Sequence, residues 1–346
     1  MNNNAIRIGF VGAGANTKLQ HLPKFSTIEG VEIISVCNRS LKSSQLVADE
    51  FDIPKIYDNW IDLVEAPDTN AICIGTWPYM HYPITLAALQ NDKHVLTEAR
   101  MAMNAQEAHT MMNAARTKPH LITQIVPAPT TFKVDNMIKE LIVNGYLGDI
   151  LSVDINANEG SFIDRESPLH WRHNRNLSGY NIMQMGIWYE TLLRWIGPAS
   201  SVSAITAVNV KTRQDENSNT HIISIPDHVE ILCETISGPM VHMSFSTVTG
   251  LNSPDQVWLF GTNGTLRLDV STMTLFGGQR NDSHLSEIKI PKRKEGKWRV
   301  EEEFVSAIRG LESITHTSFE DGVKYMEFSE AVTRSAQSGT KISLPI

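Results

Sequence analysis

The chain has 346 residues, of which 41 % are hydrophobic and 20 % are charged, and its formal net charge is −8 at pH 7. This length predicts two packed domains, and the composition is that of a globular protein and excludes a disordered chain. The negative charge argues against a nucleic-acid-binding surface, and the lack of any run of about 18 apolar residues argues against a membrane-spanning helix. The one basic stretch, residues 291–299, leads into three successive glutamates, which is typical of a solvated loop before a helix.

Three cysteines, Cys37, Cys73 and Cys233, each lie alone within an apolar run. Isolated cysteines do not form a disulfide framework, so we expect reduced, buried side chains. Residues 1–5 have neither the basic nor the apolar region of a secretory leader, and the expected location is therefore cytoplasmic.

From residue 6 to about residue 124, short apolar runs alternate with segments of helical spacing. Strands are predicted at Ile6–Val11, Glu32–Cys37, Ala71–Ile74, His94–Leu96 and Leu121–Gln124. Helical spacing appears between them, for example at Ile84–Gln90 and Ala105–Arg116. This alternation predicts parallel βαβ units in a doubly wound sheet, so residues 1–126 are expected to form an α/β Rossmann domain that binds a dinucleotide.

After Pro127 the pattern changes to longer helices and a run of consecutive strands. Helices are predicted at Phe132–Asn144, Tyr180–Ile196, Val300–Arg309 and Asp321–Ser338. Strands are predicted at Ile150–Asn156, Val202–Val210, His228–Ile236, Met240–Val248, Gln256–Phe260, Thr265–Asp269 and Lys341–Leu344. Residues 127–346 are therefore expected to form an α+β domain with an open, mainly antiparallel sheet, in which residues 213–220 are a flap or a surface loop.

A glycine-rich turn follows the first predicted strand. Gly12 suits a tight turn there, and Gly14 lets the backbone approach a pyrophosphate at the N-terminus of the next helix. The third glycine of the usual fingerprint is replaced by Thr17, at a position that governs packing more than ligand contact. We expect residues 12–17, including Ala15 and Asn16, to bind the dinucleotide; the alternative is a glycine turn with no ligand.

The second strand ends in Asn38-Arg39-Ser40, where an acidic residue would accept hydrogen bonds from the adenosine ribose. An amide, a guanidinium and a hydroxyl suit phosphate oxygens instead, so this segment favours NADP over NAD. The alternative is that Asn38 and Ser40 cap the next helix.

Several further segments stand out along the chain. They are the Gly12 turn with His21-Leu-Pro23, Thr76-Trp-Pro78-Tyr-Met-His81, Lys93-His-Val-Leu-Thr-Glu98, Trp171-Arg172, Ser178-Gly179 with Gly186, Phe260-Gly-Thr-Asn-Gly-Thr265, and Phe319-Glu-Asp-Gly322. Together, these segments resemble the glucose–fructose oxidoreductase/inositol dehydrogenase (Gfo/Idh/MocA) family. The resemblance implies a Rossmann domain, an α+β domain with an open sheet, a sugar-like small-molecule substrate, and homodimers or homotetramers built on that sheet. It also implies that Thr76, Trp77, His81 and Glu98 contact the cofactor.

Three chemical groups that the family resemblance leads one to expect are absent. The family's Glu-Lys-Pro stretch aligns with Glu98-Ala99-Arg100, and its aspartate and histidine on one helix face align with Gln184 and Trp188. Neither an amide nor an indole titrates in a useful range, although both can bind a sugar by hydrogen bonding and stacking. We therefore expect Gln184 and Trp188, with Trp171 and Arg172, to bind substrate.

Replacement groups for proton transfer lie nearby in the sequence. Tyr189 beside Arg100 is the predicted pair, because a cation favours phenolate, and His173 and His170 are further candidates. The alternatives are that Tyr189 and Trp188 are core residues, that Glu190 pairs with Arg194 on an exposed helix face, and that both histidines are solvated. His-x-x-His at 170–173 has no third ligand at suitable spacing, which argues against zinc.

The predicted function is an NAD(P)-dependent oxidoreductase of a sugar, polyol or related hydroxy compound. Two alternatives remain open. One is a redox-neutral enzyme of the epimerase or glycosidase type that uses the dinucleotide transiently, and the other is a non-catalytic protein that binds a dinucleotide or a sugar.

Overall fold

The computed structural model describes residues 5–182 and 184–346, so residues 1–4 of the predicted leaderless N-terminus and Met183 of the predicted helix 180–196 lie outside it. The chain forms two compact units. One comprises residues 1–127 and 299–323, and the other comprises residues 128–298 and 324–346. A single boundary after residue 126 does not describe this arrangement, because residues 299–323 return to the first unit.

The first unit contains a six-stranded parallel sheet in the order β3-β2-β1-β4-β5-β6. Its strands are β1 (Ile6–Val11), β2 (Val31–Cys37), β3 (Lys55–Ile56), β4 (Ala71–Ile74), β5 (His94–Thr97) and β6 (Thr123–Ile125). The doubly wound Rossmann sheet is thus confirmed, and its strand order reverses between β1 and β4, which is where ligands bind in such sheets.

Helices connect the strands of this sheet. They are η1 (Thr17–His21), α1 (Leu22–Phe25), α2 (Leu41–Phe51), α3 (Trp60–Glu65), α4 (Pro78–Gln90) and α5 (Ala105–Arg116), with α9 (Val300–Ile308) from the returning segment. All four residues of β4 are buried, as expected for a strand covered on both faces. Phe25 of α1 makes edge-to-face contacts with Phe10 of β1 and Phe304 of α9, so an aromatic cluster holds α9 in the first unit.

The second unit contains a nine-stranded sheet in the order β16-β15-β14-β13-β7-β12-β11-β8-β17. Its strands are β7 (Ile150–Asn158), β8 (Ala199–Ala207), β11 (His228–Thr235), β12 (Met240–Ser246), β13 (Gln256–Gly261), β14 (Gly264–Asp269), β15 (Thr274–Gln279), β16 (Ser286–Glu287) and β17 (Ile342–Ser343). The sheet is mainly antiparallel, as predicted. It is not a simple meander, because β7 lies between β12 and β13 and pairs with β12 in parallel.

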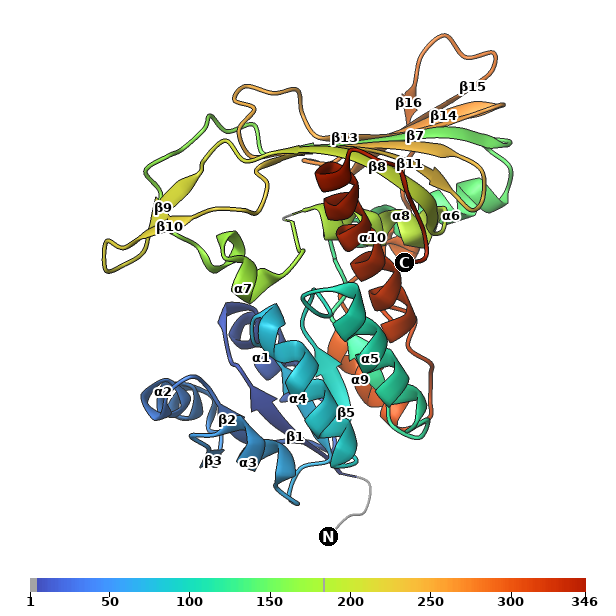
Figure 1. Ribbon diagram of the computed structural model, residues 1–346. Coiled ribbons are helices and arrows are strands. Elements are labelled where there is room, and N and C mark those ends of the chain that lie inside the picture. The colour runs from blue at the N-terminus through green and yellow to red at the C-terminus, as the bar shows by residue number, and fades with distance from the viewer. Residues whose placement is uncertain (1–4, 183) are drawn as a thin grey trace. The chain divides into compact units, whose positions relative to one another are not determined.

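Helices of the second unit lie on the same side of this sheet (Figure 1): α6 (Phe132–Val143), α8 (Met185–Trp195) and the second-unit part of α10 (Phe319–Ser338). Shorter helical turns are η2 (Trp171–His173), α7 (Arg175–Ser178) and η3 (Lys292–Lys294). The segment expected to be a flap or loop forms a two-stranded hairpin, β9 (Thr212–Gln214) with β10 (Thr220–Ile222).

Helix α8 begins at Met185 rather than at Tyr180. Gly179 and Gln184 both have a positive φ, of 64° and 53°, which a continuous right-handed helix does not accommodate. Within α8, Arg194 pairs with Glu190 at 3.0 Å, as the spacing predicted. The expected exposure was wrong: the Glu190 side chain is 2 % exposed, and Arg194 also pairs with the buried Asp135 of α6 at 2.9 Å.

Candidate functional site

The glycine turn after β1 lies against the end of β4. Gly12 has a φ of +84°, and a Cβ on it would lie 2.7 Å from the backbone nitrogen of Thr76. Any side chain there would collide with backbone, so the sequence needs glycine for the turn itself.

Gly14 has a different environment from Gly12. A Cβ on Gly14 would have only the carbonyl oxygen of Gly75 within 4 Å, at 3.8 Å, and its φ is not positive. Thr17, at the position of the third glycine, is 1 % exposed, and its hydroxyl donates to the Gly12 carbonyl at 3.3 Å. Thr17 therefore packs inside the turn, whereas Gly14 leaves open space that a ligand can enter.

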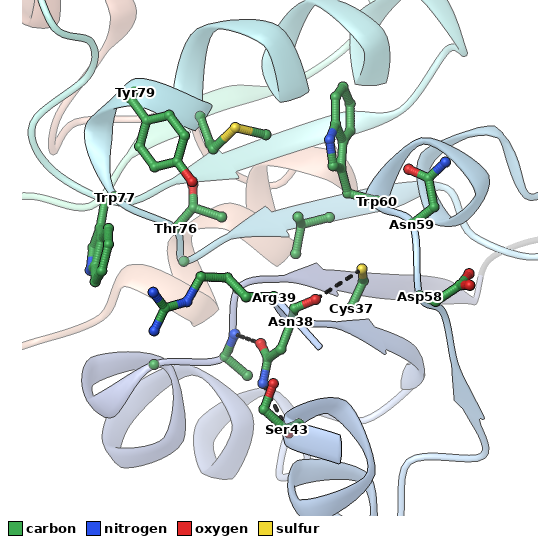
Figure 2. Close-up of a pocket in the computed structure, with 16 residues that line it drawn as sticks. Cys37, Asn38, Arg39, Ser43, Asp58, Asn59, Trp60, Thr76, Trp77 and Tyr79 are labelled. Carbon is green, nitrogen blue, oxygen red and sulfur yellow. Dashed lines mark hydrogen bonds between the residues drawn. The ribbon is translucent and has the colours of Figure 1, made fainter. Parts of the chain in front are cut away.

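A cavity of about 530 Å³ opens beside this turn in the first unit (Figure 2). The lining residues come from the carboxyl ends of β1 and β2, from the loops that follow β1, β2, β3 and β4, and from the first turns of α2, α3 and α4. They are Val11, Gly12, Ala13, Gly14, Cys37, Asn38, Arg39, Ser43, Asp58, Asn59, Trp60, Gly75, Thr76, Trp77, Tyr79 and Met80. The predicted residues Gly12, Gly14, Arg39, Thr76 and Trp77 thus meet around one hollow.

Asn38 and Ser40 mainly stabilise the local backbone. The Asn38 side-chain oxygen accepts a hydrogen bond from the Ala13 N–H at 2.6 Å, and its amide donates to the Ser43 carbonyl at 3.1 Å. Ser40 is the N-cap of α2 and accepts from the Ser43 N–H. The capping alternative is therefore confirmed for Ser40, while the Asn38 side chain ties the glycine turn to β2.

Arg39 differs from its two neighbours because its side chain extends along the cavity wall. Its guanidinium carbon lies 4.7 Å from the centre of the Trp77 ring (Figure 2). The indole holds this exposed cation in place by a cation–π contact.

Some lining residues were not identified from the sequence. Asp58, Asn59 and Trp60 follow β3, and Figure 2 shows Asp58 and Asn59 at the end of the cavity away from Trp77. Strand β3 has only two residues, which is too short for a periodic pattern. Tyr79 and Met80 lie in the first turn of α4. They belong to the stretch 76–81, in which cofactor contact was predicted only for Thr76, Trp77 and His81.

These residues fit the adenosine half of a dinucleotide. A backbone turn at a helix N-terminus suits a pyrophosphate, and the cavity offers aromatic rings and hydrogen-bonding groups for a base and a ribose. The hydroxyl oxygen of Thr76 is buried without a hydrogen-bond partner among the described residues, which leaves one polar atom for a ligand.

His81, the predicted cofactor contact on α4, is fully buried. Its ring nitrogens lie 2.9 Å from the Thr76 carbonyl and 2.8 Å from the Arg100 carbonyl, and burial lowers the pKa of His81. His81 therefore joins the loop after β4 to the loop after β5. It would affect a bound cofactor through the positions of these loops and not by direct contact.

Glu98 follows β5 and lies in a cluster with three other side chains. Asn16 of the glycine turn donates to Glu98 Oε1, and His21 Nε2 lies 3.1 Å from the same oxygen. The other nitrogen of His21 lies 2.6 Å from Glu301 Oε1 on α9. The predicted residues Asn16 and Glu98 thus meet, and His21 and Glu301 join them.

In the second unit, Arg172, His173 and Gln184 line two small adjoining cavities. Arg172 and His173 line one cavity and Gln184 lines the other, and both cavities are lined by Pro226, Asp227 and Thr247. The Arg172 guanidinium also lies 4.2 Å from the centre of the Trp171 ring. Three of the predicted substrate-side residues therefore gather around Asp227, which sequence reasoning missed.

His170 and His173 are joined by local hydrogen bonds rather than fully solvated. The His170 N–H donates to His173 Nδ1 at 3.2 Å, and the Arg172 N–H donates to His170 Nδ1. Burial, together with the charge of Arg213, lowers the pKa of His173 to about 4, so its ring is neutral near pH 7.

Tyr189 and Trp188 are core residues of the second unit, each 1 % exposed. The Tyr189 ring stacks on Phe328 of α10 with a centroid separation of 3.7 Å, and its hydroxyl accepts a hydrogen bond from the Ala199 N–H at 3.0 Å. Burial raises the pKa of Tyr189, which is the opposite of what a proton carrier requires. The predicted proton transfer by Tyr189 and substrate contact by Trp188 do not fit this environment.

The parallel sheet, the glycine turn and the cavity at its carboxyl edge define a dinucleotide-binding Rossmann protein. Residues 6–124 match the oxidoreductase family with an NAD-binding Rossmann fold, and residues 136–267 match the GFO/IDH/MocA C-terminal domain. The chain belongs to the Gfo/Idh/MocA family of oxidoreductases, as the sequence motifs indicated.

Curated relatives of the chain include dehydrogenases. It is 27 % identical to a trans-1,2-dihydrobenzene-1,2-diol dehydrogenase of Mus musculus over 80 % of both chains. It is also 27 % identical to a glucose-6-phosphate 3-dehydrogenase of Bacillus subtilis, over 65 % of this chain and 63 % of that protein.

Solved structures share the fold over nearly the whole chain. A levoglucosan dehydrogenase in complex with NADH and L-sorbose superposes with a TM-score of 0.84 at 19 % identity, covering 98 % of this chain and 99 % of that one. The WlbA dehydrogenase from Bordetella pertussis, in complex with NADH and UDP-GlcNAcA, gives a TM-score of 0.77 at 19 % identity and covers 99 % of both chains.

No helix among the described residues is long and apolar enough to cross a membrane. No group of three or more histidine, cysteine, aspartate or glutamate side chains in this part of the chain is arranged to hold a metal ion.

Proposed function

We propose that this protein is an NAD(P)-dependent dehydrogenase of a sugar, a polyol or a related hydroxy compound. The observation that carries the proposal is the cavity at the switch point of the Rossmann sheet, with Gly12 and Gly14 at its edge. The named activities of the relatives, which include a D-glucoside 3-dehydrogenase of Escherichia coli, support this substrate class.

Within that function, Arg39 favours NADP over NAD. No acidic side chain stands at residue 38, so nothing there repels a 2′-phosphate, and the Arg39 guanidinium is held at the cavity wall by Trp77. Asp58 lines the same cavity, but Figure 2 shows it at the opposite end from Trp77.

Different residues of this chain bind the dinucleotide and transfer the proton. When bound, the dinucleotide supplies the hydride acceptor or donor. The turn around Gly14 holds the pyrophosphate, and Arg39, Trp60 and Thr76 hold the adenosine half. A separate group must accept the hydroxyl proton, because Ala99 and Gln184 replace the titrating residues of the family pattern.

His173 is the residue that we propose for this proton. It lines a cavity with Arg172 and Asp227, and its pKa of about 4 leaves the ring neutral near pH 7. Its Nδ1 accepts the His170 N–H, so a substrate hydroxyl has to replace that hydrogen bond before this lone pair can take its proton. Arg172 and Gln184 supply hydrogen bonds to substrate hydroxyls.

A panel of sugars and polyols with NAD⁺ and NADP⁺ tests the function by the absorbance of reduced nicotinamide. Net reduction supports the dehydrogenase. Isotope exchange in the substrate without net reduction identifies a redox-neutral enzyme instead, which the loss of titrating groups at residues 99, 184 and 188 also allows. Thermal stabilisation by ligands without any turnover identifies a binding protein.

We also propose that the chain forms a homodimer or homotetramer through the face of the large sheet opposite α8. That face carries exposed apolar side chains, among them Ile205 at 77 %, Leu232 at 55 % and Met240 at 58 % exposure. The register places Glu230, Glu234 and His242 on the same face, and a sheet face that mixes exposed apolar and charged side chains can form a subunit interface.

A further inference from the structure

A buried histidine lies between two glutamates at the carboxyl edge of the Rossmann sheet. His21 is 0 % exposed, with one ring nitrogen 2.6 Å from Glu301 Oε1 and the other 3.1 Å from Glu98 Oε1. Glu301 is also 0 % exposed, whereas Glu98 keeps 16 % exposure. The three side chains form the triad Glu98–His21–Glu301.

The triad joins three distant parts of the sequence within the first unit. His21 ends η1, just after the glycine turn, and Glu98 directly follows β5. Glu301 lies in the first turn of α9, in the segment that returns to this unit after residue 298. The Phe10–Phe25–Phe304 cluster fixes α1 beside α9, and thereby places His21 next to Glu301.

The hydrogen bonds of the triad decide the charges of His21 and Glu98. Burial opposes protonation of His21, but its hydrogen bonds to Glu301 and Glu98 prevail and raise its pKa to about 9. Burial also opposes ionisation of Glu98, but the hydrogen bond from His21 prevails and lowers its pKa. His21 is therefore protonated and Glu98 is ionised near pH 7.

The charge of Glu98 is accessible to a ligand, because Glu98 is the member of the triad that retains solvent exposure. Asn16 of the glycine turn donates to Glu98 Oε1. Since β4 lies between β1 and β5, this bond crosses the carboxyl end of β4 at the switch point. The second half of a doubly wound sheet, which begins at β4, takes the second nucleotide of a dinucleotide.

We propose that Glu98, positioned by His21 and Glu301, makes the site prefer the oxidised form of the dinucleotide over the reduced form. The oxidised nicotinamide ring carries a positive charge and the reduced ring carries none. An anionic carboxylate at the carboxyl edge of that half of the sheet therefore attracts the oxidised form and not the reduced form. This inference rests on the proposed dinucleotide binding, and it assigns to His21 and Glu301 a positioning role.

A purely structural triad leads to a different expectation. Loss of a structural contact weakens the fold and reduces the affinities for both redox forms by the same factor. A charge that interacts with the nicotinamide ring changes the ratio of the two affinities. A change in the stability of the fold does not change this ratio.

The test measures dissociation constants for NAD⁺ and NADH by calorimetry on the full chain, and repeats them with NADP⁺ and NADPH. In Glu98→Gln, which keeps the shape and removes the charge, the affinity for the oxidised form relative to the reduced form should fall on the order of tenfold. Glu301→Gln should shift the ratio in the same direction by a smaller factor, and serves also if Glu98→Gln does not fold. Glu65→Gln, on the exposed end of α3, removes an equal charge elsewhere and should leave the ratio unchanged.

Equal losses for both redox forms in Glu98→Gln and Glu301→Gln would overturn the inference and leave the proposed function intact. A wild-type protein that binds neither form of either dinucleotide would overturn both.

Discussion

The guanidinium of Arg39 and the indole of Trp77 stack 4.7 Å apart, although they come from the ends of different strands, β2 and β4. This contact holds a cation at the cavity wall before any ligand arrives. Pre-positioning of the cation reduces the entropy that is lost when it binds a phosphate.

Replacement of Arg39 by alanine should weaken NADP⁺ binding specifically. The loss should be about 1.5–3 kcal/mol, as for a hydrogen bond to a charged group, and NAD⁺ affinity should change little. Titration calorimetry with both cofactors measures the difference, and Trp77→Ala, which keeps the cation but frees it, should give a smaller loss. An equal loss of affinity for both cofactors in Arg39→Ala would mean that Arg39 does not bind the 2′-phosphate.

Gly14 and Gly12 should respond differently to a side chain. Gly14→Val should leave a folded protein and abolish dinucleotide binding, because its side chain enters open space at the cavity edge. Gly12→Val should destabilise the first unit, since its Cβ would lie 2.7 Å from the Thr76 backbone. Circular dichroism and calorimetry separate the two effects, and retained cofactor affinity in Gly14→Val would mean that the turn is only structural.

The burial of Tyr189 predicts a stability defect without a catalytic one. Tyr189→Phe leaves the buried Ala199 N–H without its acceptor and should cost about 1–3 kcal/mol in the free energy of unfolding, with turnover near the wild-type value. His173→Gln should instead lower turnover roughly 10²–10⁴-fold, as expected for loss of a general base. Urea unfolding measures the stability of both variants, and steady-state kinetics measures their turnover. A large loss of turnover in Tyr189→Phe with near wild-type turnover in His173→Gln would restore Tyr189 as the proton carrier.

The pKa of His21 predicts how stability depends on pH. Because the folded-state pKa is raised from 6.5 to about 9, the folded state keeps a proton that the unfolded state loses between these values. The stabilisation is therefore complete below about pH 6.5 and is lost as the pH rises through about 9, by on the order of 3 kcal/mol. Urea unfolding at several pH values measures this slope. His21→Gln should flatten it, and an unchanged slope in that variant would contradict the assignment.

The exposed sheet face predicts association of the chain. Light scattering at micromolar concentration should give the mass of a dimer or a tetramer, and Leu232→Glu should shift it towards the monomer, because a charge in an apolar interface is costly. Leu311→Glu, which alters an apolar side chain of the first unit that is 75 % exposed, is the control and should not change the mass. A monomeric wild-type protein would rule out the interface.

Much of the first unit was predictable because its signals are local. Apolar runs alternating with helical spacing fix a parallel sheet, and the turn at Gly12 and Gly14 follows the first strand directly. Asp58 and Trp60 were missed because β3, which precedes them, has only two residues. For Ser40, the sequence favoured cofactor contact and left helix capping as the alternative, since a hydroxyl serves both, and the structure shows the cap.

The remaining features depend on contacts between residues that are far apart in the chain. The position of Tyr189 on an amphipathic helix does not reveal which side meets the core, and only the packing of Phe328 on its ring decides this. The insertion of β7 between β12 and β13 follows from pairing partners about 90 residues or more away. Likewise, no local pattern connects His21 with Glu301, which lies 280 residues further along. The sequence determined the fold class and the phosphate-binding turn, because short-range patterns encode them; the tertiary structure decided which titrating side chains are buried together, because burial depends on long-range packing.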